Sequence, residues 1–453
     1  MINMMKFFLI PVVLCMAITT SFAQFKGGEA SYSDLNDSET VASFKKHVSY
    51  LASASMEGRA AGSEGEKAAA DYLYEVMKSY GIDMLSNVDG DLFGIKKDNG
   101  DTLTSRNVVG FIGGYDKQLK NSYIVIGARM DNLGVGSITV DGEQQRRTYY
   151  GANGNASGMA MLMELSRMLS TNSLMLRRSV LLVGFGASDS LCAGAWYFLN
   201  RSFPDVANID AMINLDMLGT GDSGFYAYTS SNADMNDIAT AIGQSLQPIM
   251  PQVTSQEPYS SDHRAFYDKQ IPSVFFTSGK YPEHNTEKDT PSILNYEYME
   301  KELEYIYSYA MALINGSKPI FNPSEPVRTK TRSKGDVYSY YDCDQKPAFL
   351  GSTDPATFLE KWVYHYLKYP NEAVKKGIQG RVLVDFIIDE SGAVTEAKIL
   401  RSVDPLLDDE ALRIVNASPK WRAGRVRGQK VKTQMTITVE FKLTKKGSFG
   451  IKK

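Results

Sequence analysis

The sequence predicts a doubly wound α/β domain with a mostly parallel sheet, followed by a small α+β domain. Two observations indicate the first domain. Apolar, β-branched runs that suit buried parallel strands alternate with segments of helical apolar periodicity, and polar residues follow the strands. A third observation separates the second domain: residues 318–335 are rich in Pro, Ser, Thr and basic residues, lack apolar periodicity, and therefore resemble a linker.

Three strands and one helix define the predicted α/β domain, and polar residues lie toward the carboxyl ends of the strands. The strands are residues 122–127, before Arg129 and Asp131; residues 179–185, before Ser188 and Asp189; and residues 211–219, which contain Asp216. Residues 151–158 (Gly-Ala-Asn-Gly-Asn-Ala-Ser-Gly) open a helix whose apolar residues share a broad face. Because the carboxyl ends of parallel strands meet at one sheet edge, we expect the polar residues to line a crevice there.

This first domain resembles the co-catalytic di-zinc aminopeptidases, the clan that includes bacterial leucyl aminopeptidase and glutamate carboxypeptidase II. The resemblance covers residues 51–315 and includes further motifs on both sides of the strands. These motifs are Met56-Glu-Gly-Arg59, Gly62-Ser-Glu-Gly-Glu66, Ser261-Asp-His-Arg, Ile271-Pro272 and Asp289-Thr290.

The resemblance implies two zinc ions that activate a bridging water. It assigns the five ligand positions to Arg129, Asn153, Asp189, Asp216 and His284, and the general base to the position of Ser188. Only Asp216 keeps both residue type and motif. His284 is followed by one more residue before the Asp-Thr pair than the family usually has, and His263 matches a position that supports the pocket without binding metal.

The substitutions predict a degenerate site without a metal cofactor. A guanidinium at position 129 has no lone pair to donate to zinc. An amide at position 153 cannot bridge two ions, and a hydroxyl at position 188 cannot act as a general base near neutral pH. Asp189 remains a competent oxygen ligand, so one zinc held by Asp189, Asp216 and His284 is the alternative, with Glu283 as a substitute base.

Arg129 has a second expected role. Asp131, Asp189 and Asp216 converge on the crevice, and without a dication their mutual repulsion raises their pKa values. We hypothesise that the Arg129 guanidinium supplies the positive charge and pairs with two of these carboxylates in a fork. The alternative is that Arg129 points to solvent.

The second domain is predicted from alternating strands and one amphipathic helix. The strands are residues 381–388, 393–401 and 435–443, a turn lies at 389–392, and the helix spans 406–417. This pattern resembles the C-terminal domain of TonB-type energy transducers over residues 336–443. The matching segments include Tyr369-Pro370, Gly377-Ile-Gln-Gly-Arg-Val382, Asp389-Glu-Ser-Gly392, Asp404-Pro-Leu-Leu-Asp408 and Pro419-Lys-Trp421.

The second resemblance implies docking on an outer-membrane receptor or another envelope protein through residues 336–443. A stabilising domain with no partner is the alternative. After residue 23, no apolar run approaches the ~20 residues that a bilayer requires, so we expect no transmembrane helix in the mature chain. The net charge of −3, with no basic stripe, does not indicate nucleic-acid binding.

The N-terminus predicts export. Residues 1–23 resemble a secretory signal peptide cleaved near Ala23, which predicts a periplasmic or secreted protein. The expected domains are therefore residues 24–317 and 336–453, joined by residues 318–335. The mature chain keeps Cys192 and Cys343, too few for a disulfide framework, although pairing between them remains an alternative.

Together these observations predict a catalytically inactive pseudo-peptidase of the envelope that binds a peptide or acts as a scaffold and carries a TonB-like docking module. An active zinc-dependent exopeptidase with a modified metal site is the alternative. A third hypothesis gives the leading role to the C-terminal module, with the first domain only positioning it.

Overall fold

The computed structural model describes residues 37–96, 101–140, 143–221, 224–254, 257–323, 337–340, 343, 345–426 and 428–443. The predicted signal peptide and residues 324–335 of the predicted linker lie outside these ranges. The chain divides into residues 1–38 and Glu39–Lys453, and the elements below belong to the second unit.

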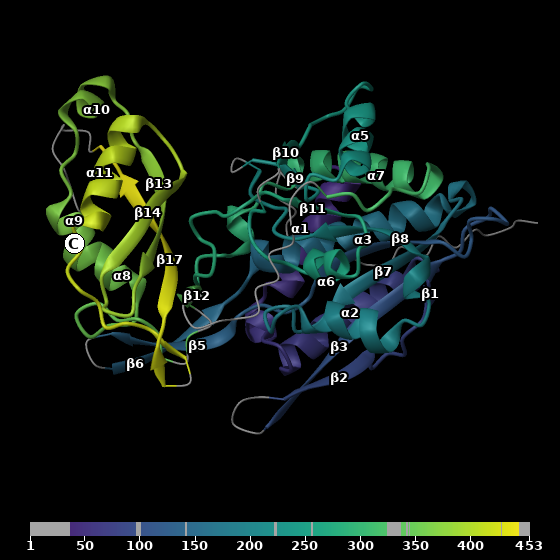
Figure 1. Cartoon of the computed structure of the whole chain (residues 1–453), viewed down its shortest axis with the longest axis horizontal. Helices are drawn as coiled ribbons and strands as arrows, with labels where there is room; N and C mark the ends of the chain where they lie inside the picture. The colour runs from purple at the N-terminus through teal and green to yellow at the C-terminus, as the bar shows by residue number, and fades with distance from the viewer. Residues whose placement is uncertain are drawn as a thin grey trace, which may run out of the picture. The chain divides into compact units, whose positions relative to one another are not determined.

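A nine-stranded sheet forms the centre of the first domain (Figure 1). Its strands lie in the order β1-β3-β7-β4-β8-β11-β9-β10, and β2 pairs with β3. Their bounds are β1 (Asp83–Met84), β2 (Asp91–Lys96), β3 (Thr102–Ile112), β4 (Tyr123–Arg129), β7 (Ser179–Phe185), β8 (Ile209–Leu215), β9 (Tyr226–Tyr228), β10 (Gln252–Thr254) and β11 (Ser273–Thr277). A separate hairpin consists of β5 (Gly134–Val140) and β6 (Glu143–Tyr149).

The central strands confirm the predicted mostly parallel sheet. Strand β4 pairs in parallel with both β7 and β8, and β8 pairs in parallel with β11. Toward the edges the sheet is mixed, because β3 pairs antiparallel with β7 and β9 pairs antiparallel with β11. The predicted strand 179–185 agrees with β7, whereas β4 extends to include Arg129, which the sequence placed in a loop.

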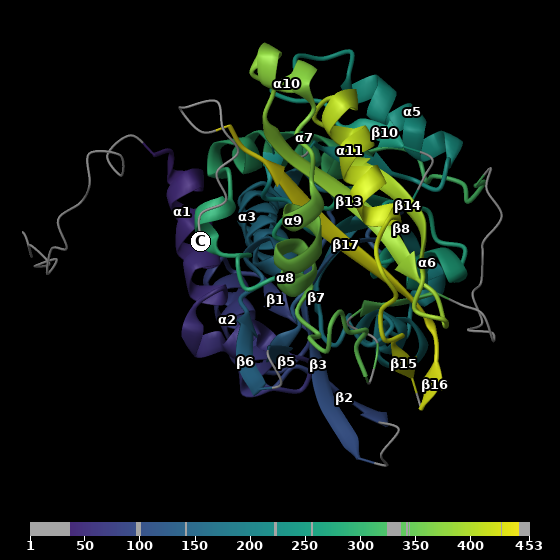
Figure 2. The ribbon, with the colours of Figure 1, turned by 90° about the vertical axis from the view of Figure 1, so that its left-hand side faces the viewer.

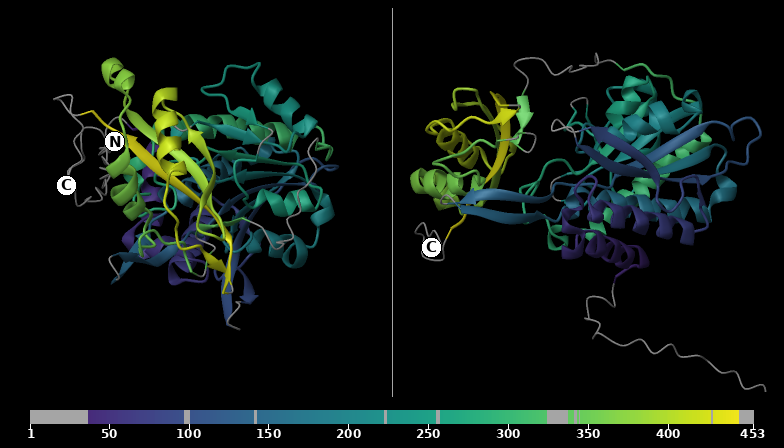
Figure 3. Two further views of the ribbon diagram at one scale, coloured as in Figure 1. Left: turned by 60° about the vertical axis from the view of Figure 1, so that its left-hand side comes forward. Right: turned by 90° about the horizontal axis from the view of Figure 1, so that it is seen from below.

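Helices cover both faces of the sheet, as the alternation of buried residues requires. In β4, Ile124 and Ile126 belong to one core cluster and Val125 to the other. The larger cluster includes residues of α1, α2, α3, α5 and α7, and the smaller one includes residues of α4, η4 and α6. Figure 3 shows the N-terminal helices, in purple, against one side of the sheet.

The helices of the first domain are α1 (Glu39–Leu51), η1 (Ala54–Arg59), α2 (Glu64–Ser79), η2 (Ala152–Ala156), α3 (Ser157–Thr171), η3 (Ser173–Met175), α4 (Ala193–Tyr197), η4 (Phe198–Ser202), η5 (Val206–Asn208), α5 (Ala233–Ile242), α6 (His263–Asp268), η7 (Pro291–Ile293) and α7 (Tyr296–Asn315). The predicted helix after the glycine-rich segment is α3, which begins at Ser157 after the irregular turn η2.

A four-stranded sheet with the order β12-β17-β13-β14 forms the C-terminal region. Its strands are β12 (Val337–Ser339), β13 (Gly380–Ile388), β14 (Val394–Arg401) and β17 (Lys432–Phe441), and a short hairpin comprises β15 (Arg425–Val426) and β16 (Gln429–Lys430). The helices are α8 (Pro355–Phe358), η9 (Leu359–Val363), α9 (Tyr364–Tyr366), α10 (Asn371–Lys376) and α11 (Pro405–Asn416), seen in front of the sheet in Figure 2.

This α+β region agrees with the sequence prediction. The three predicted strands and the helix correspond to β13, β14, β17 and α11, with bounds that differ by one to three residues. Alternate residues of β17, from Met435 to Phe441, are buried and pack against α11, Phe386 and Trp421 in one apolar core. Asp404 caps α11, because its carboxylate accepts a hydrogen bond from Leu406 N (2.9 Å).

Three further predictions concern the chain as a whole. Among the described helices, none combines the length and apolar character that a bilayer span requires. Cys192 and Cys343 are both free thiols. Residues at the start of the predicted linker lie against the first domain, because Lys318 Nζ is 2.8 Å from Asp210 Oδ1 and Ile320 N donates to Asp234 Oδ2 (2.8 Å).

Candidate functional site

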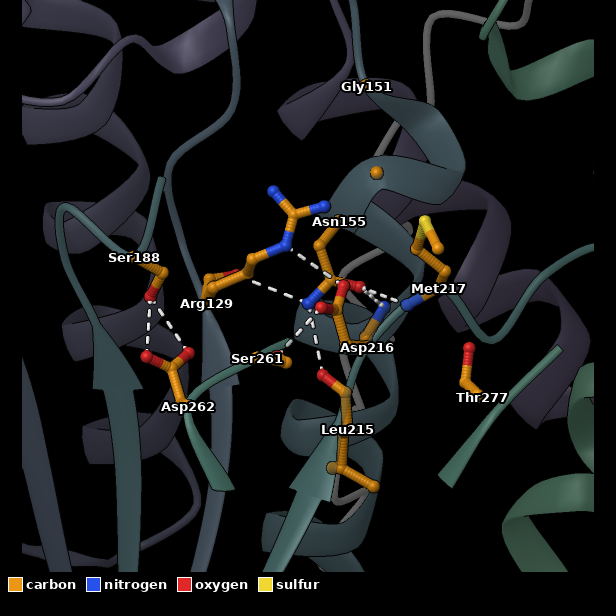
Figure 4. A network of polar contacts seen from close by, with 12 residues as sticks. Arg129, Gly151, Asn155, Ser188, Leu215, Asp216, Met217, Ser261, Asp262 and Thr277 are labelled. Atoms are coloured by element: carbon orange, nitrogen blue, oxygen red, sulfur yellow. Dashed lines mark hydrogen bonds and ion pairs between the residues drawn. The ribbon is translucent and has the colours of Figure 1, made fainter. Parts of the chain in front are cut away.

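The candidate site lies at the carboxyl ends of the central strands (Figure 4). Arg129 is the last residue of β4, Asp216 directly follows β8, and Ser188 follows β7 by three residues. The parallel register of β7, β4 and β8 brings these positions to one sheet edge. Neighbouring strand ends therefore bring these predicted site positions together.

Arg129 and Asp216 form an ion pair across this edge. Arg129 Nε lies 2.9 Å from Asp216 Oδ1, and the two side chains are 12% and 2% exposed. Arg129 Nη1 donates to the backbone carbonyl of Asp131 (3.0 Å) rather than to its carboxylate. Arg129 therefore points into the site, as expected. Its guanidinium contacts the carboxylate of Asp216 and the backbone carbonyl of Asp131, whereas two carboxylates were expected.

The surrounding carboxylates keep this guanidinium charged. Burial alone lowers the pKa of Arg129, but the negative charges of Asp216, Asp189 and Asp131 outweigh burial and raise that pKa above its ordinary value. The second oxygen of Asp216 accepts a hydrogen bond from Ser261 Oγ (2.9 Å), which in turn accepts one from Asn214 Nδ2 (2.9 Å). Asp216 is thus fixed from two sides, with Arg129 as its positive partner.

Asp131 holds the loop that follows β7. Its carboxylate accepts hydrogen bonds from the backbone N–H groups of Ser188 (2.8 Å) and Asp189 (3.0 Å). Burial raises the pKa of Asp131, and the nearby carboxylates of Glu66 and Asp189 raise it further. Asp189 itself is exposed, so the two acidic residues that sequence grouped together have different surroundings. Asp131 positions the loop, whereas Asp189 faces solvent.

Ser188, at the predicted general-base position, donates its hydroxyl to Asp262. The Ser188 Oγ atom lies 2.9 Å and 2.8 Å from the two carboxylate oxygens of Asp262. Dashed lines mark these two contacts in Figure 4. Burial raises the pKa of Asp262 to about 7, although hydrogen bonds from Ser188 and Cys192 act in the opposite direction. Asp262 was not predicted as a site residue, although it lies in the Ser261-Asp-His motif that marks this segment.

Asn153 is buried, and its side-chain amide forms hydrogen bonds with two hydroxyl groups. Its Nδ2 donates to Thr220 Oγ1 (3.3 Å), and its Oδ1 accepts from Ser157 Oγ (2.9 Å). The next residue faces Arg129 instead: a Cβ atom added to Gly154 would lie 3.4 Å from Arg129 Nη2 and 3.3 Å from Asp289 Oδ2. A side chain at position 154 would therefore lie beside the Arg129 guanidinium, but this position is a glycine. Gly154 was not predicted as a site residue.

His284 lies on the loop after β11, near the edge of the site. Its ring centroid is 5.4 Å from that of Tyr281, whose hydroxyl donates to Asp289 Oδ2 (2.6 Å). Burial, followed by the positive charges of Lys280 and Arg129, lowers the pKa of His284 to about 3. The imidazole is therefore neutral at physiological pH. Asp289 also accepts from Asn153 N (2.8 Å) and Gly154 N (3.1 Å), which anchors the η2 turn.

Arg59 links the loops that follow β4 and β6, and this role was not predicted from the sequence. Its fully buried guanidinium donates to the backbone carbonyls of Met130 (3.1 Å), Tyr150 (3.0 Å) and Gly151 (2.9 Å), and also to that of Leu51. These carbonyls flank Asp131 and η2, so Arg59 ties the β4 loop to the β6 loop. The Met56-Glu-Gly-Arg59 motif was the available signal, but its role depends on contacts between distant segments.

The donor set at this site does not fit a zinc ion. Arg129 occupies one implied ligand position with a cation, and Gly154 contributes no side-chain donor beside it. Among the described residues, no group of three or more His, Cys, Asp or Glu side chains is arranged to hold a metal ion. The implied ligands Asp189, Asp216 and His284 all belong to the first domain, but they do not form such a group.

The fold is that of an α/β domain with a mostly parallel central sheet and polar residues at its strand ends. Residues 107–310 match peptidase family M28, and residues 365–443 match the C-terminal domain of the Gram-negative bacterial TonB protein. The chain thus contains an M28 zinc-aminopeptidase-like domain followed by a TonB C-terminal domain, as both sequence resemblances predicted.

Individual relatives are distant. Leupeptin-inactivating enzyme 1 of Streptomyces exfoliatus is 22% identical over 248 residues, which cover 53% of this chain and 49% of the relative. The chain therefore spans about half the length of this curated relative.

Several solved structures are similar to this chain at low sequence identity. They include an aminopeptidase from Aneurinibacillus sp. strain AM-1 (17% identity, TM-score 0.49, 63% of this chain and 96% of that one) and LapB from Legionella pneumophila (20%, 0.48, 61% and 72%). Glutaminyl cyclase from Tannerella forsythia is also similar (18%, 0.48, 61% and 99%).

Proposed function

We propose that the M28-type domain of this chain is a catalytically inactive, metal-free domain that binds peptides or acts as a scaffold. The observation that carries the proposal is the Arg129–Asp216 ion pair, with Nε and Oδ1 2.9 Å apart. Asp216 is the one implied zinc ligand that keeps both its residue type and its motif, and its partner is a guanidinium. A guanidinium donates no lone pair and repels a dication, so the same carboxylate oxygen serves the arginine instead of a metal.

Two further contacts support the loss of hydrolysis. Ser188 occupies the general-base position, and its hydroxyl donates to Asp262, so it is itself a hydrogen-bond donor and not a proton acceptor. Asp131 uses both carboxylate oxygens to hold the backbone of Ser188 and Asp189. The polar groups of the site therefore stabilise one another, which suits a binding surface more than a turnover site.

The decisive experiment combines zinc content with hydrolysis in the purified mature chain. We expect less zinc than protein by elemental analysis, no release of anilide from aminoacyl anilides, and no effect of a chelator on either measurement. A stoichiometric amount of zinc with chelator-sensitive turnover would instead establish the active exopeptidase and overturn the proposal. An Asp216→Asn variant is the matched control, because an active enzyme would lose both zinc and turnover in that variant.

Peptide binding is tested separately by titration with labelled short peptides. Asp189 is exposed and acidic, and it lies beside the buried Arg129–Asp216 pair. We expect peptides with a free N-terminal amine to bind more tightly than the same peptides after N-terminal acetylation. The difference is expected to shrink in Asp189→Asn. Equal binding of both peptide forms would favour a scaffold that does not recognise peptide N-termini.

The TonB C-terminal domain suggests interaction with outer-membrane receptors and implies a Gram-negative cell envelope. We propose that residues 336–443 dock the chain on such a receptor after export by the N-terminal signal peptide. A photo-crosslinking residue at Lys398, an exposed position in β14, is expected to capture a receptor in cells. The same residue at Arg146, an exposed position in the first domain, is the control. Capture only from position 146 would contradict docking through the C-terminal domain.

A further inference from the structure

The C-terminal domain contains a local excess of positive charge that the net charge of −3 conceals. Between Glu410 and Glu440 the sequence has seven basic residues and no acidic residue: Arg413, Lys420, Arg422, Arg425, Arg427, Lys430 and Lys432. Arg413 pairs with Glu410, with Nε 2.7 Å from Oε2, and Arg427 lies outside the described residues. The other five, Lys420, Arg422, Arg425, Lys430 and Lys432, are called the hairpin bases below.

Two of the hairpin bases face each other across the β15–β16 hairpin. Arg425 and Lys430 are register partners in this antiparallel pair. Side chains that are directly opposite in such a pair lie on the same face with their Cβ atoms about 5 Å apart, and like charges at these positions are destabilising. Arg425 Nη1 donates to Gly428 O (2.8 Å), which satisfies one donor without neutralising the charge. The hairpin therefore places two cations together.

Buried neighbours hold two further hairpin bases, Lys420 and Arg422, at the surface. Lys420 and Arg422 are exposed, whereas Trp421, between them, is 5% exposed and packs against Phe349 and Phe358. The backbone of Arg422 exchanges two hydrogen bonds with Ala348 (2.8 and 3.0 Å). This alternation leaves the cationic side chains outside and fixes the backbone that carries them.

The hairpin bases form no ion pairs within the part of the chain that the structure describes. Ion pairs in these ranges include Arg413–Glu410 and Lys398–Asp385 in the same domain, but none involves a hairpin base. Among residues 420–432, no large apolar side chain is highly exposed. The surface is thus suited to electrostatic attraction and does not provide an apolar wedge for insertion.

We propose that the hairpin bases bind the phosphate groups of an anionic phospholipid surface. A guanidinium matches phosphate oxygens in a bidentate manner, and an ammonium adds a compact charge beside it. A phosphate between Arg425 and Lys430 would remove their repulsion. Figure 2 shows β15 and β16 at the lower end of the C-terminal sheet. Exposed cations such as Lys420, Arg422 and Lys430 suit an extended anionic surface better than they enclose an acidic peptide. The proposal is independent of whether the M28-type domain is inactive.

The expected affinity follows from the number of charges. Each Lys or Arg near an anionic membrane strengthens partitioning by roughly fivefold at moderate salt. Removing two charges in Arg425→Gln/Lys430→Gln is therefore expected to weaken binding about 25-fold. Salt is expected to abolish binding, because the screening length falls to about 3 Å at 1 M.

The experiment is co-sedimentation of the full mature chain with vesicles of phosphatidylcholine alone or of equal amounts of phosphatidylcholine and phosphatidylglycerol. We expect binding only to the second composition and its loss in the double variant. The matched control is Lys375→Gln/Lys376→Gln, which removes two exposed charges from α10 of the same domain and is expected to bind like the unmodified chain. Thermal melting verifies folding, and the hairpin variant is expected to melt no lower than the unmodified chain because it relieves like-charge repulsion.

Three results would overturn the proposal. The first is absence of binding to phosphatidylglycerol vesicles at low salt. The second is equal weakening by the hairpin and α10 variants, which would indicate a response to net charge alone. The third is binding of soluble polyglutamate, with loss in the hairpin variant, but no binding of vesicles, which would assign the surface to an acidic polypeptide.

Discussion

Arg129 Nε lies 2.9 Å from Asp216 Oδ1, and this pair occupies the sheet edge at which the family resemblance implies a zinc ligand set. Asp216 is 2% exposed, with Asp131 and Asp189 among the charges that act on Arg129. A carboxylate so buried requires a positive partner, because the free energy of an unpaired buried charge is high. Arg129 is therefore expected to stabilise the fold by neutralising this carboxylate.

Arg129→Ala is expected to lower the free energy of unfolding by about 3–5 kcal/mol, since it leaves the Asp216 carboxylate buried without a cation. Arg129→Lys is expected to cost less, because it keeps the charge while losing the planar fork. Urea unfolding at neutral pH measures both. The control is Arg146→Ala, which breaks the exposed pair with Glu57 and is expected to change stability by about 0.5 kcal/mol or less. Equal effects at positions 129 and 146 would refute the structural role of Arg129.

Asp262 predicts a fall in stability as pH rises. Burial raises the pKa of Asp262 from an ordinary value of 3.8 to about 7. The folded state therefore binds one more proton than the unfolded state between about pH 4 and pH 7. The stabilisation is complete below the unfolded pKa and is lost as pH rises through the folded pKa. A shift of this size corresponds to a change on the order of 4 kcal/mol across the window.

The contribution of Asp262 is isolated by comparison with Asp262→Asn, which keeps an oxygen that accepts from Ser188. Other carboxyl groups with raised pKa values, including Asp131 and Glu302, titrate in both proteins, so the difference in slope belongs to position 262. Urea unfolding at several pH values between about 4 and 8 provides the slopes. Parallel curves for the two proteins would show that Asp262 titrates at an ordinary pKa.

The place of Gly154 beside Arg129 indicates how two substitutions could create a metal site. Gly154 has φ −114°, which other residues adopt, and its absent side chain points toward Arg129. We expect Arg129→His/Gly154→Asp to bind zinc, because the pair adds a nitrogen and an oxygen donor beside Asp216. Zinc at about 100 times its dissociation constant is expected to stabilise this variant by about 2.7 kcal/mol. Thermal melting with and without zinc measures the effect.

The matched control is Arg129→His/Asn153→Asp, which places the new carboxylate at the neighbouring position. Asn153 points toward Thr220 and Ser157, so this variant is expected to show no comparable stabilisation by zinc. Stabilisation of the position-153 variant alone would restore the assignment that the sequence resemblance made and would contradict the geometry of η2.

Strands with a clear apolar pattern could be predicted from the sequence, whereas strands with many exposed residues could not. The continuous apolar run Tyr123-Ile-Val-Ile predicted β4. A strand that is buried on both faces needs apolar residues at successive positions, and this is a local property of the sequence. The alternation of Met435, Ile437, Val439 and Phe441 likewise predicted β17. The antiparallel edge strand β2 and the hairpin β5–β6 were not predicted, since their pairing depends on contacts between segments and their exposed residues lack strong periodicity.

The sequence by itself determined the α/β domain, the TonB-like α+β domain and the chemical character of the altered site, because residue type and apolar period are fixed along the chain. Only the tertiary structure decided where the altered side chains point. Asn153 turns toward Thr220 while position 154 faces Arg129, and Ser188 reaches Asp262 from a distant segment. These directions follow from hydrogen bonds between segments far apart in sequence, and no local pattern encodes which segment will supply the partner.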